Sequence, residues 1–513
     1  MLNGYLNQDY VGTELEQLSA AGIGGLCVFD MGARGSKEVL PPAGPQFLSD
    51  KWIDNFGTIL NEAGKLNMNV QLAVSSSWDM GGSWVEPDEA CLALYHNSII
   101  VNGPSELNRK LPFPEVSANA ILDTHGIPVF YKDVAVLAIP INRRQIAHEF
   151  IFMLSPDEMH TIDHVVLHQC QNEDSNQFGD ENLFSKKFSI SVSTTDYLET
   201  SFIKVLKSSL EQDFEPQRFD FLPIEAQYVR LRLYNNSDTE SDQIQLGEIE
   251  LFSIEGENLV VSPRFGRGDG GMMVRFNSEF GHNNRWTASN IIDGDLSGPE
   301  GYWASEGLPP LFVEDPNSVL VITEYLDEDG HLKWKVPPGE WKIIRYLSTN
   351  TGEKLKIPNP ASDGLATDHF SALATRNYIE HLAGSLEERF GDLRKTPLKQ
   401  LYLPSFEVRG SLWTLDLMEQ FEGYRGYDMI RYLPALSGLI IENEEITTRF
   451  LYDFQKTMGD LLVDAYYRTS NKTANKFGLE VEAESGGPGP PVHKVPVDAL
   501  KALGAIGQMR GEF

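Results

Sequence analysis

The segment GIGGLCVFD, residues 22–30, is a short apolar run without helical spacing, and it ends in a carboxylate, Asp30. Residues 50–66 follow with apolar side chains at helical spacing, and their first residue is of a type that caps helices. MNVQLAV at 68–74 is a second apolar run. A strand, a loop, a helix and a strand joined by such short connections are typical of βα units in a parallel sheet.

The pattern changes near residue 97. Short β-rich segments such as FSISVST at 188–194 and YVRLRLYN at 228–235 then alternate with turn-forming residues. This alternation predicts antiparallel sheets packed as sandwiches. The βα pattern returns near residue 341, with the following predicted elements: strands at 341–348, 399–407 and 478–485, and helices at 371–390, about 445–470 and 498–507.

We therefore predict an α/β fold, an incomplete (β/α)8 TIM-type barrel interrupted by an inserted antiparallel β-sandwich region. Residues 1–97 form the first part of the barrel, 98–335 the insertion, and 336–513 the second part, cut before the last strands. A closed barrel needs eight parallel strands, and the chain offers fewer, so we interpret it as a fragment truncated at both ends. The alternative is an open, doubly wound sheet.

Composition excludes several classes of function. The 513 residues include 42 Lys and Arg against 74 Asp and Glu, which gives a net charge of −32. Such acidity argues against partners made of nucleic acid and against an anionic membrane surface. No apolar run is long enough to span a bilayer. The three cysteines are widely spaced, and neither a Walker loop, a GxGxxG turn that opens a helix, a GxSxG elbow nor an HExxH motif occurs.

Carboxylates end several predicted strands. Glu407 ends KQLYLPSFE, Glu484 lies at the end of GLEVEAES, and Glu512 follows Arg510 and Gly511 at the start of a last segment. The C-terminal strand ends of a βα barrel share one mouth, so these side chains are expected to converge there. Two convergent carboxylates can hydrolyse a glycosidic bond. Metal binding by the same oxygens, or simple helix capping and pairing with Arg, are the alternatives.

Tryptophans accompany these acids. Trp78 and Trp84 lie in SSSWDMGGSW, and Trp413 follows Glu407 in EVRGSLWT. An indole on an exposed loop offers a flat apolar face to a sugar ring, although packing against the barrel is the more common role of a loop Trp.

The motifs resemble glycoside hydrolase family 106, the α-L-rhamnosidase family. The stretches that carry the resemblance, in order, are residues 3–32, 74–91, 130–140, 334–354, 362–371 (SDGLATDHFS), 404–414 (PSFEVRGSLWT), 424–438 and VEAESGGPGPP through RGEF at 481–513. They span both barrel portions, and their order is more specific than any one motif. Two departures are the absent first strand and the absent final strands.

The resemblance implies an inverting hydrolase of terminal α-L-rhamnose in plant polysaccharides or glycosides, with calcium at the site. It implies that Glu407 is the general acid and that Glu512 is the base, with Glu484 a third active-site carboxylate that holds sugar hydroxyls or the metal. The assignment of the base between Glu484 and Glu512 stays open. The candidate substrate-binding residues are Asp30, Trp78, Trp84, Asp368, His369, Arg409 and Trp413.

Residues of about 145–305 are similar to a discoidin-like, galactose-binding sandwich, although the motif that usually opens this fold, NRWTASNIIDGDLSGPEGYWAS at 284–305, comes last. The acidity and the few cysteines fit a secreted or periplasmic bacterial protein, although no signal peptide begins the chain. The alternatives to a rhamnosidase are a carbohydrate-binding or scaffold fragment without turnover, and a glycosidase of the same fold that acts on another sugar.

Overall fold

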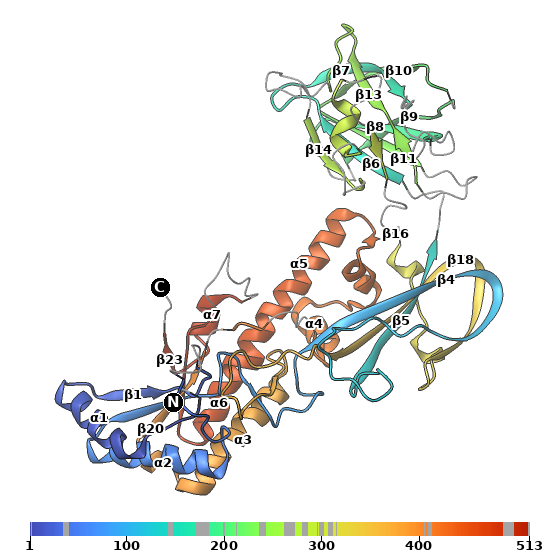
Figure 1. Ribbon diagram of the computed structural model, residues 1–513. Coiled ribbons are helices and arrows are strands. Elements are labelled where there is room, and N and C mark those ends of the chain that lie inside the picture. Colours follow the sequence, from blue (N-terminus) through green and yellow to red (C-terminus); the bar gives the residue numbers. More distant parts are fainter. Residues whose placement is uncertain are drawn as a thin grey trace.

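The computed structural model describes residues 1–513 except for the following: 2, 34–39, 142–146, 170–183, 198–200, 212, 235–242, 261–271, 280–285, 295, 297–301, 306–310, 314, 405, 409–412, 486–496, 511–513 and the side chain of 444. Figure 1 shows a parallel sheet with helices at one end of the molecule and an all-β region at the other. A long antiparallel sheet lies between them.

The parallel sheet has five strands in the order β1-β2-β20-β22-β23, and all of their pairings are parallel. The strands are β1 (Gly25–Val28), β2 (Asn69–Ala73), β20 (Leu398–Leu403), β22 (Glu480–Ala483) and β23 (Gln508–Met509). Each new strand is therefore added beside the previous one, on the same edge. Strand order that follows chain order is the arrangement found along the wall of a βα barrel. Within the described residues these strands form an open sheet.

A helix precedes each parallel strand. The helices are α1 (Gln8–Ala20), α2 (Asp50–Lys65), α3 (Ala372–Phe390), α4 (Leu417–Arg425), α5 (Glu444–Leu461), the π-helix η8 (Leu462–Arg468), α6 (Thr469–Lys476) and α7 (Ala499–Leu503). In α2, Trp52, Ile53, Phe56, Ile59 and Leu60 recur at the spacing of one helical face, and all of them are buried. This face packs into the hydrophobic core that it shares with the sheet.

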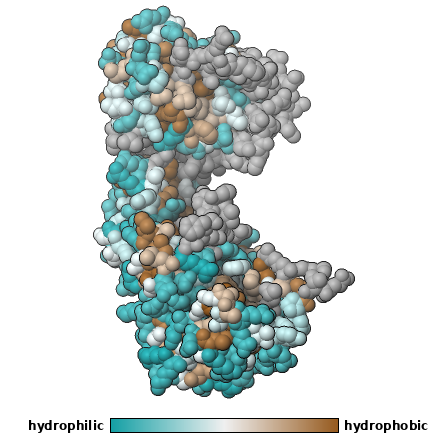
Figure 2. All heavy atoms as spheres, turned by 90° about the vertical axis from the view of Figure 1, so that its left-hand side faces the viewer, coloured by the Kyte–Doolittle hydropathy of each residue, from teal (hydrophilic) through white to brown (hydrophobic). Residues whose placement is uncertain are grey.

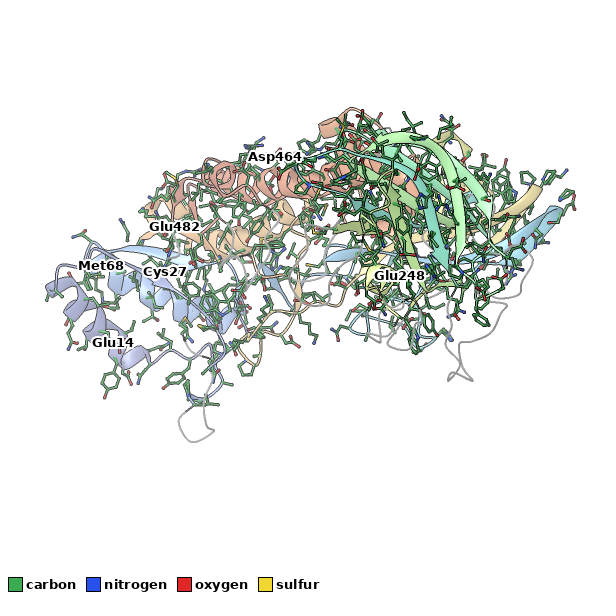
Figure 3. The ribbon with its side chains drawn as sticks, turned by 90° about the horizontal axis from the view of Figure 1, so that it is seen from above. Glu14, Cys27, Met68, Glu248, Asp464 and Glu482 are labelled. Carbon is green, nitrogen blue, oxygen red and sulfur yellow. The ribbon has the colours of Figure 1, made fainter. Side chains whose placement is uncertain are left out.

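The two faces of the parallel sheet differ in polarity. Val28, Leu72, Leu401 and Val481 are buried in the core with the helices. The alternate residues point to the opposite face, where Gln71 of β2 donates a hydrogen bond of 2.6 Å to Glu482 of β22. Figure 3 labels Glu482 and Cys27, a β1 residue whose register partner is Gln71. A polar face of this kind suits the inside of a barrel that binds a polar ligand.

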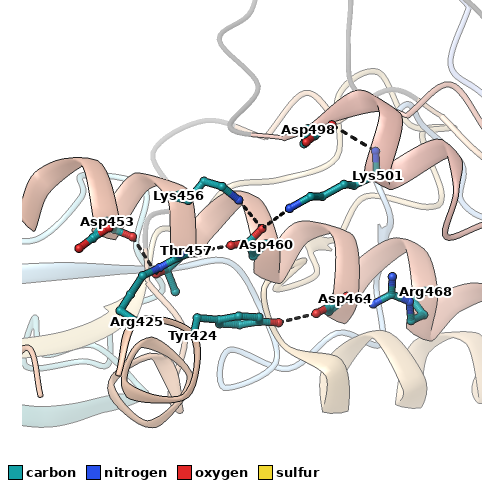
Figure 4. Close-up of polar contacts among 10 residues, drawn as sticks. All are labelled: Tyr424, Arg425, Asp453, Lys456, Thr457, Asp460, Asp464, Arg468, Asp498 and Lys501. Carbon is teal, nitrogen blue, oxygen red and sulfur yellow. Dashed lines mark hydrogen bonds and ion pairs between the residues drawn. The ribbon is translucent and has the colours of Figure 1, made fainter. Parts of the chain in front are cut away.

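Polar contacts fix the helices that lead into β22 and β23 (Figure 4). Asp460 of α5 accepts hydrogen bonds from Arg425 of α4 and from Lys456, and it pairs with Lys501 of α7 at 3.4 Å. Although burial of its carboxyl group opposes the effect, Lys456 and Arg425 hold the pKa of Asp460 below its ordinary value. One carboxylate thus joins three helices.

The antiparallel sheet corrects one prediction. Its order is β17-β5-β18-β4, formed by β4 (Leu92–Lys110), β5 (Tyr131–Ile141), β17 (Leu320–Val321) and β18 (His331–Asn350). The predicted parallel barrel strand at 341–348 is wrong, because these residues belong to β18 and pair antiparallel with β4 and β5. The run is continuously apolar, like a buried parallel strand, because β18 is covered on both faces, with Ile344 in one hydrophobic cluster and Ile343 in another. The domain limits drawn at 97 and 335 consequently fall inside β4 and β18.

Two antiparallel sheets enclose a separate core between residues 147 and 304. One sheet has the order β14-β6-β11-β8-β9 and consists of Met272–Phe276, Ala147–Met153, Tyr228–Tyr234, Lys187–Ser193 and Ile203–Ser209. The other has the order β10-β7-β13 and consists of Gln217–Ala226, His160–His168 and Glu248–Ser253. A two-stranded pair, β12 (Gln245–Leu246) with β15 (Trp303–Ala304), lies beside them. Figure 2 shows this region above the helical part, and on the face in view its described surface mixes hydrophilic and hydrophobic residues.

Two short pairs complete the fold: β16 (Phe312–Val313) with β21 (Ile440–Ile441), and β3 (Gly81–Gly82) with β19 (Leu365–Ala366). The backbones of β3 and β19 approach so closely that Gly81 must be a glycine, since a Cβ atom there would lie 2.3 Å from the carbonyl oxygen of Leu365. It joins the loop after β2 to the segment after β18. None of the helices in the described part of the chain is long and apolar enough to cross a membrane.

Candidate active site

Asp79, Lys356 and Glu407 come from three separate loops and meet after the C-terminal ends of β2 and β20. The Lys356 Nζ lies 3.2 Å from the Glu407 Oε2 and 3.5 Å from the Asp79 Oδ2. It also donates a hydrogen bond to the backbone carbonyl of Glu407. The Glu407 backbone N–H in turn donates to the Asp79 Oδ1 at 2.9 Å. These contacts hold Glu407 by its backbone and by its carboxylate.

The two acids of this group differ in exposure. The Asp79 side chain is completely buried, whereas those of Glu407 and Lys356 are 23% and 25% exposed. Burial raises the pKa of Asp79 to about 6, against the opposing effect of the Lys356 cation. Glu407 is therefore the acid of this group that a ligand can reach, and Asp79 holds its two partners in place.

Ser76, in the loop that carries Asp79, connects this loop to Asp30. The Asp30 carboxylate accepts hydrogen bonds from the Trp52 Nε1 at 2.6 Å and from the Ser76 Oγ at 3.2 Å. The Ser76 Oγ also accepts the backbone N–H of Asn359 at 2.9 Å. Asp30 is fully buried, and burial raises its pKa to about 6. Each carboxylate oxygen of Asp30 thus has a hydrogen-bond partner. The contacts of Ser76 also hold together the loops that follow β1, β2 and β18.

Glu484 belongs to a second group, at the ends of β20, β22 and β23. It accepts a hydrogen bond from the Tyr402 hydroxyl, and the Arg510 Nε lies 3.8 Å from its Oε1. The Arg510 guanidinium also lies over the Tyr402 ring, 4.6 Å from its centroid. The Tyr402 ring lies 5.0 Å from Phe29, which lies 5.5 Å from Trp78.

Buried Tyr466 lies near a member of each group. Burial raises its pKa far above the ordinary value, and both Asp79 and Tyr402 add to this effect. Its ring also packs against His369, with centroids 4.5 Å apart. Glu407 and Glu484 follow the neighbouring strands β20 and β22.

Asp368 and His369 lie behind these groups rather than at the surface, since both are almost fully buried. Burial lowers the pKa of His369 to about 4, so its imidazole is neutral at pH 7. Its ring packs edge-on against Phe406, one residue before Glu407. Asp368 accepts the Phe370 backbone N–H at 2.9 Å, and burial raises its pKa to about 7.

The tryptophans differ in environment. Trp413 is 2% exposed and lies in the main core. Trp78 and Trp84 are half-buried. Trp84 stacks on Tyr378 of α3 at 5.3 Å, away from the carboxylates. Of the three, Trp78 is the one whose ring contacts join the group that holds Glu484. Glu512 and Arg409 lie outside the described residues.

Sequence reasoning missed Asp79, Lys356, Tyr402 and Arg510. Asp79 lies in the quoted segment SSSWDMGGSW. Its position after a predicted strand, like that of Glu407, could have identified it as a candidate site residue. Tyr402 and Arg510 share a face with Glu484 only through the strand register. Lys356 reaches the site from a loop after an antiparallel strand, and nothing in its sequence context indicated this.

The raised pKa of Asp368 predicts how stability depends on pH. Unfolded, this carboxyl group has its ordinary pKa of 3.8, and folded it has a pKa of about 7, so the folded chain retains the proton. The contribution of this group to stability is complete when the pH is below 3.8, its pKa in the unfolded chain. The contribution is lost as the pH rises through about 7, its pKa in the folded chain. Between about pH 5 and about pH 8, we expect this group to cost roughly 2–3 kcal/mol of unfolding free energy.

Denaturant unfolding at both pH values measures this difference. Asp368→Asn should lose less stability than the parent over this interval, because an amide does not titrate. Asp363→Asn is the control, since Asp363 is 50% exposed and pairs with Lys354. An equal pH dependence in the parent and in Asp368→Asn would contradict the prediction.

The described residues around Glu484 do not form a calcium site. Ca²⁺ takes about six to eight oxygen ligands. Glu484 instead has a cation, Arg510, beside one oxygen. Within the described part of the chain, no three His, Cys, Asp or Glu side chains are arranged to hold a metal ion.

Comparisons with known proteins agree with this architecture. A family model described as alpha-L-rhamnosidase matches residues 1–502. A protein of Formosa agariphila named "Putative beta-glucuronidase" is 24% identical over 485 residues, which are 94% of this chain and 28% of that protein. The structure of a rhamnosidase from Novosphingobium sp. PP1Y is similar with a TM-score of 0.59 and 23% identity, over 98% of this chain and 47% of that one. The chain thus spans less than half the length of either relative.

Proposed function

Because this chain belongs to the alpha-L-rhamnosidase family, we propose that the protein is an inverting glycoside hydrolase that removes terminal α-L-rhamnosyl residues from plant polysaccharides or glycosides. The observation that carries the proposal is the partly exposed Glu407 carboxylate, which Lys356 and Asp79 fix after the end of β20. A carboxyl group held in this way can exchange a proton with a glycosidic oxygen.

In this proposal Glu407 protonates the leaving oxygen, and a second carboxylate activates water on the other face of the sugar. Glu512 is the proposed base, and Glu484 is the alternative. The hydrogen bond from Tyr402 and the nearby Arg510 would orient Glu484 toward sugar hydroxyls if it is not the base. Inversion requires about 6.5–9.5 Å between acid and base, which leaves room for the water.

We also propose that the five parallel strands are an arc of a (β/α)8 barrel whose lumen is lined by the polar sheet face. Chain-ordered parallel pairing and helices on one face support this. The sandwich of residues 147–304 is proposed to be discoidin-like and to act as a carbohydrate-binding or buttressing module. A site of action outside the cytoplasm would suit a polymeric plant substrate.

A second candidate is a glycosidase of the same fold that acts on a uronic acid. The name of the Formosa agariphila relative favours it. Arg510, beside Glu484, is a cation that could pair with a sugar carboxylate.

The experiment is an assay on para-nitrophenyl α-L-rhamnoside and on a panel that includes the β-D-glucuronide. Release of para-nitrophenol from the rhamnoside alone supports the first proposal. Release from the glucuronide alone would instead indicate that the substrate is a uronic acid glycoside. Absence of turnover on every glycoside, with sugar binding by calorimetry, would favour a non-catalytic carbohydrate-binding protein.

Calcium dependence stays a prediction from the resemblance. The proposed steps use side chains only, and repeating the assay with added calcium and with a chelator tests whether a metal contributes.

A further inference from the structure

Two aromatic side chains, Phe29 and Trp78, stay partly exposed beside the candidate active site. Phe29 directly follows β1, and Trp78 lies in the loop that follows β2. Every residue from 70 to 82 is buried except Trp78. Phe29 is likewise half-buried, although Val28 and Asp30 on either side of it are buried. In both segments, an aromatic ring is therefore the side chain that a ligand can reach.

The two rings contact each other and form one apolar surface. The centroids of Phe29 and Trp78 lie 5.5 Å apart, with the ring planes inclined by 51°. Phe29 also meets the edge of the buried Tyr402 ring, with centroids 5.0 Å apart. Neither Phe29 nor Trp78 belongs to a hydrophobic cluster of the described residues. The pair, which we call the aromatic wall, is thus separate from the cores that stabilise the fold.

Hydrogen bonds fix the two segments that carry the aromatic wall. Asp30, the residue after Phe29, is buried and has a hydrogen-bond partner on each carboxylate oxygen. In the loop of Trp78, the Ser75 Oγ donates to the backbone carbonyl of Asp79 at 2.6 Å. Ser75 and Asp79 are both buried. The wall is therefore formed before a ligand arrives, and binding does not have to order it.

The aromatic wall adjoins both carboxylate groups of the candidate active site. Asp79, the residue after Trp78, accepts the backbone N–H of Glu407. Tyr402, which contacts the wall, donates its hydroxyl hydrogen to Glu484. Ligand sites commonly combine an apolar surface with a few polar groups of this kind. A sugar ring that reaches both Glu407 and Glu484 would therefore have the wall beside it.

The chemistry of the wall restricts the sugar substituent that can face it. A methyl group gains from this contact, because apolar area on both sides leaves water. A hydroxymethyl group would bring a hydroxyl against the carbon atoms of the rings, where it loses water and gains no hydrogen bond. A carboxylate would lose still more hydration. The wall therefore favours a sugar whose sixth carbon is a methyl group.

We propose that the aromatic wall receives the C6 methyl group of the terminal sugar, and that Phe29 and Trp78 thereby select a 6-deoxy hexose over the same hexose with a C6 hydroxyl. The two residues determine specificity and take no part in proton transfer. This inference rests on the proposed function, because it places the wall in the site where the glycosidic bond is hydrolysed.

The test compares hydrolysis of para-nitrophenyl α-L-rhamnoside with that of para-nitrophenyl α-L-mannoside, which differ only by the hydroxyl at C6. The measured quantity is the ratio of kcat/KM for the rhamnoside to kcat/KM for the mannoside. In the parent we expect a ratio of about 10–100, the range over which an apolar surface rejects one added hydroxyl.

Phe29→Ser and Trp78→Ser should each lower this ratio by about 10-fold, because a hydroxyl and water replace part of the apolar surface. Phe113→Ser is the matched control and should keep the ratio of the parent. Phe113 is also half-buried, and its ring meets that of Tyr131 of β5 edge-on at 5.2 Å. Thermal unfolding checks that all three variants are folded at the assay temperature.

The ratio separates a role in specificity from a structural role, because a damaged fold lowers both rates together. An unchanged ratio in both Phe29→Ser and Trp78→Ser, or an equal fall in Phe113→Ser, would overturn the inference and leave the proposed function intact. Equal kcat/KM for the two glycosides in the parent would do the same. A parent that hydrolyses neither glycoside would contradict the proposed function, and this inference with it.

Discussion

Replacing Glu407 by Gln is expected to lower kcat on α-L-rhamnosides by about 10²–10⁴-fold, the usual contribution of one general acid or base. The amide keeps the size of the side chain and can still accept from Lys356, but it cannot supply a proton. The Glu407 backbone N–H bond to Asp79 is unaffected by the substitution. Unfolding free energy and KM should therefore change little.

The dependence on the leaving group separates the two roles that a carboxylate can have here. A general acid matters most for an alkyl glycoside, whose leaving oxygen is basic, and least for a para-nitrophenyl glycoside. If Glu407 is the acid, Glu407→Gln should lose far more activity on the alkyl substrate. An equal loss on both substrates would instead assign Glu407 as the base. Glu16→Gln, an exposed acid on α1, is the control and should behave like the parent.

The βα portion could be predicted because each element carries its own periodicity. Apolar runs that end in turns predicted strands close to β1, β2, β20 and β22, and the structure confirms these four. The helix predicted at 371–390 corresponds to α3, Ala372–Phe390, because Ser371 caps it and Gly391 ends it. Where helices and strands alternate, the local sequence was therefore sufficient to predict the elements.

The direction of pairing could not be read from the run at 341–348. A strand covered on both faces has the same continuous apolar pattern in a parallel and in an antiparallel sheet. These residues pair with residues 94–101 of β4, which lie 240–254 residues earlier in the chain, and β4 pairs with β18 along its full length. Such long-range pairing leaves no local signal.

The sequence predicted two acids of the candidate site, but it did not predict the residues that contact them. Glu407 and Glu484 stood out because carboxylates at the ends of apolar strands are costly to bury. That Tyr402 and Arg510 bracket Glu484 depends on the register of three strands. The burial of Trp413, expected at a sugar-binding surface, depends on its backbone pairing with Leu92, and no local pattern indicated this.

Replacing Lys356 by Met is expected to lower both stability and activity. It removes the cation 3.5 Å from the completely buried Asp79. A buried charge left without its partner is strongly destabilising, and because Lys356 is itself partly exposed we expect a loss of roughly 2–3 kcal/mol. Glu407 also loses two of its contacts with Lys356, and a displaced catalytic group can cost about 10²-fold in kcat.

The pH dependence identifies Asp79 as the source of the instability. Lys356 opposes the rise in the pKa of Asp79, which is about 6 in the parent, so the pKa of Asp79 should rise further in Lys356→Met. The protonated carboxyl group needs no cation. The stability deficit of Lys356→Met should therefore be small near pH 5 and should grow as the pH rises through about 6.

The double variant Lys356→Met with Asp79→Asn separates stability from catalysis. The amide can still accept the Glu407 N–H, and it carries no charge to bury. Unfolding free energy near pH 8 should therefore return most of the way to the parent value, whereas kcat should stay low because the Glu407 carboxylate still lacks its cation. Denaturant unfolding and rhamnoside hydrolysis measure the two effects. A double variant no more stable than Lys356→Met would mean that Asp79 is not the charge that Lys356 stabilises, and recovered kcat would mean that Lys356 does not position Glu407.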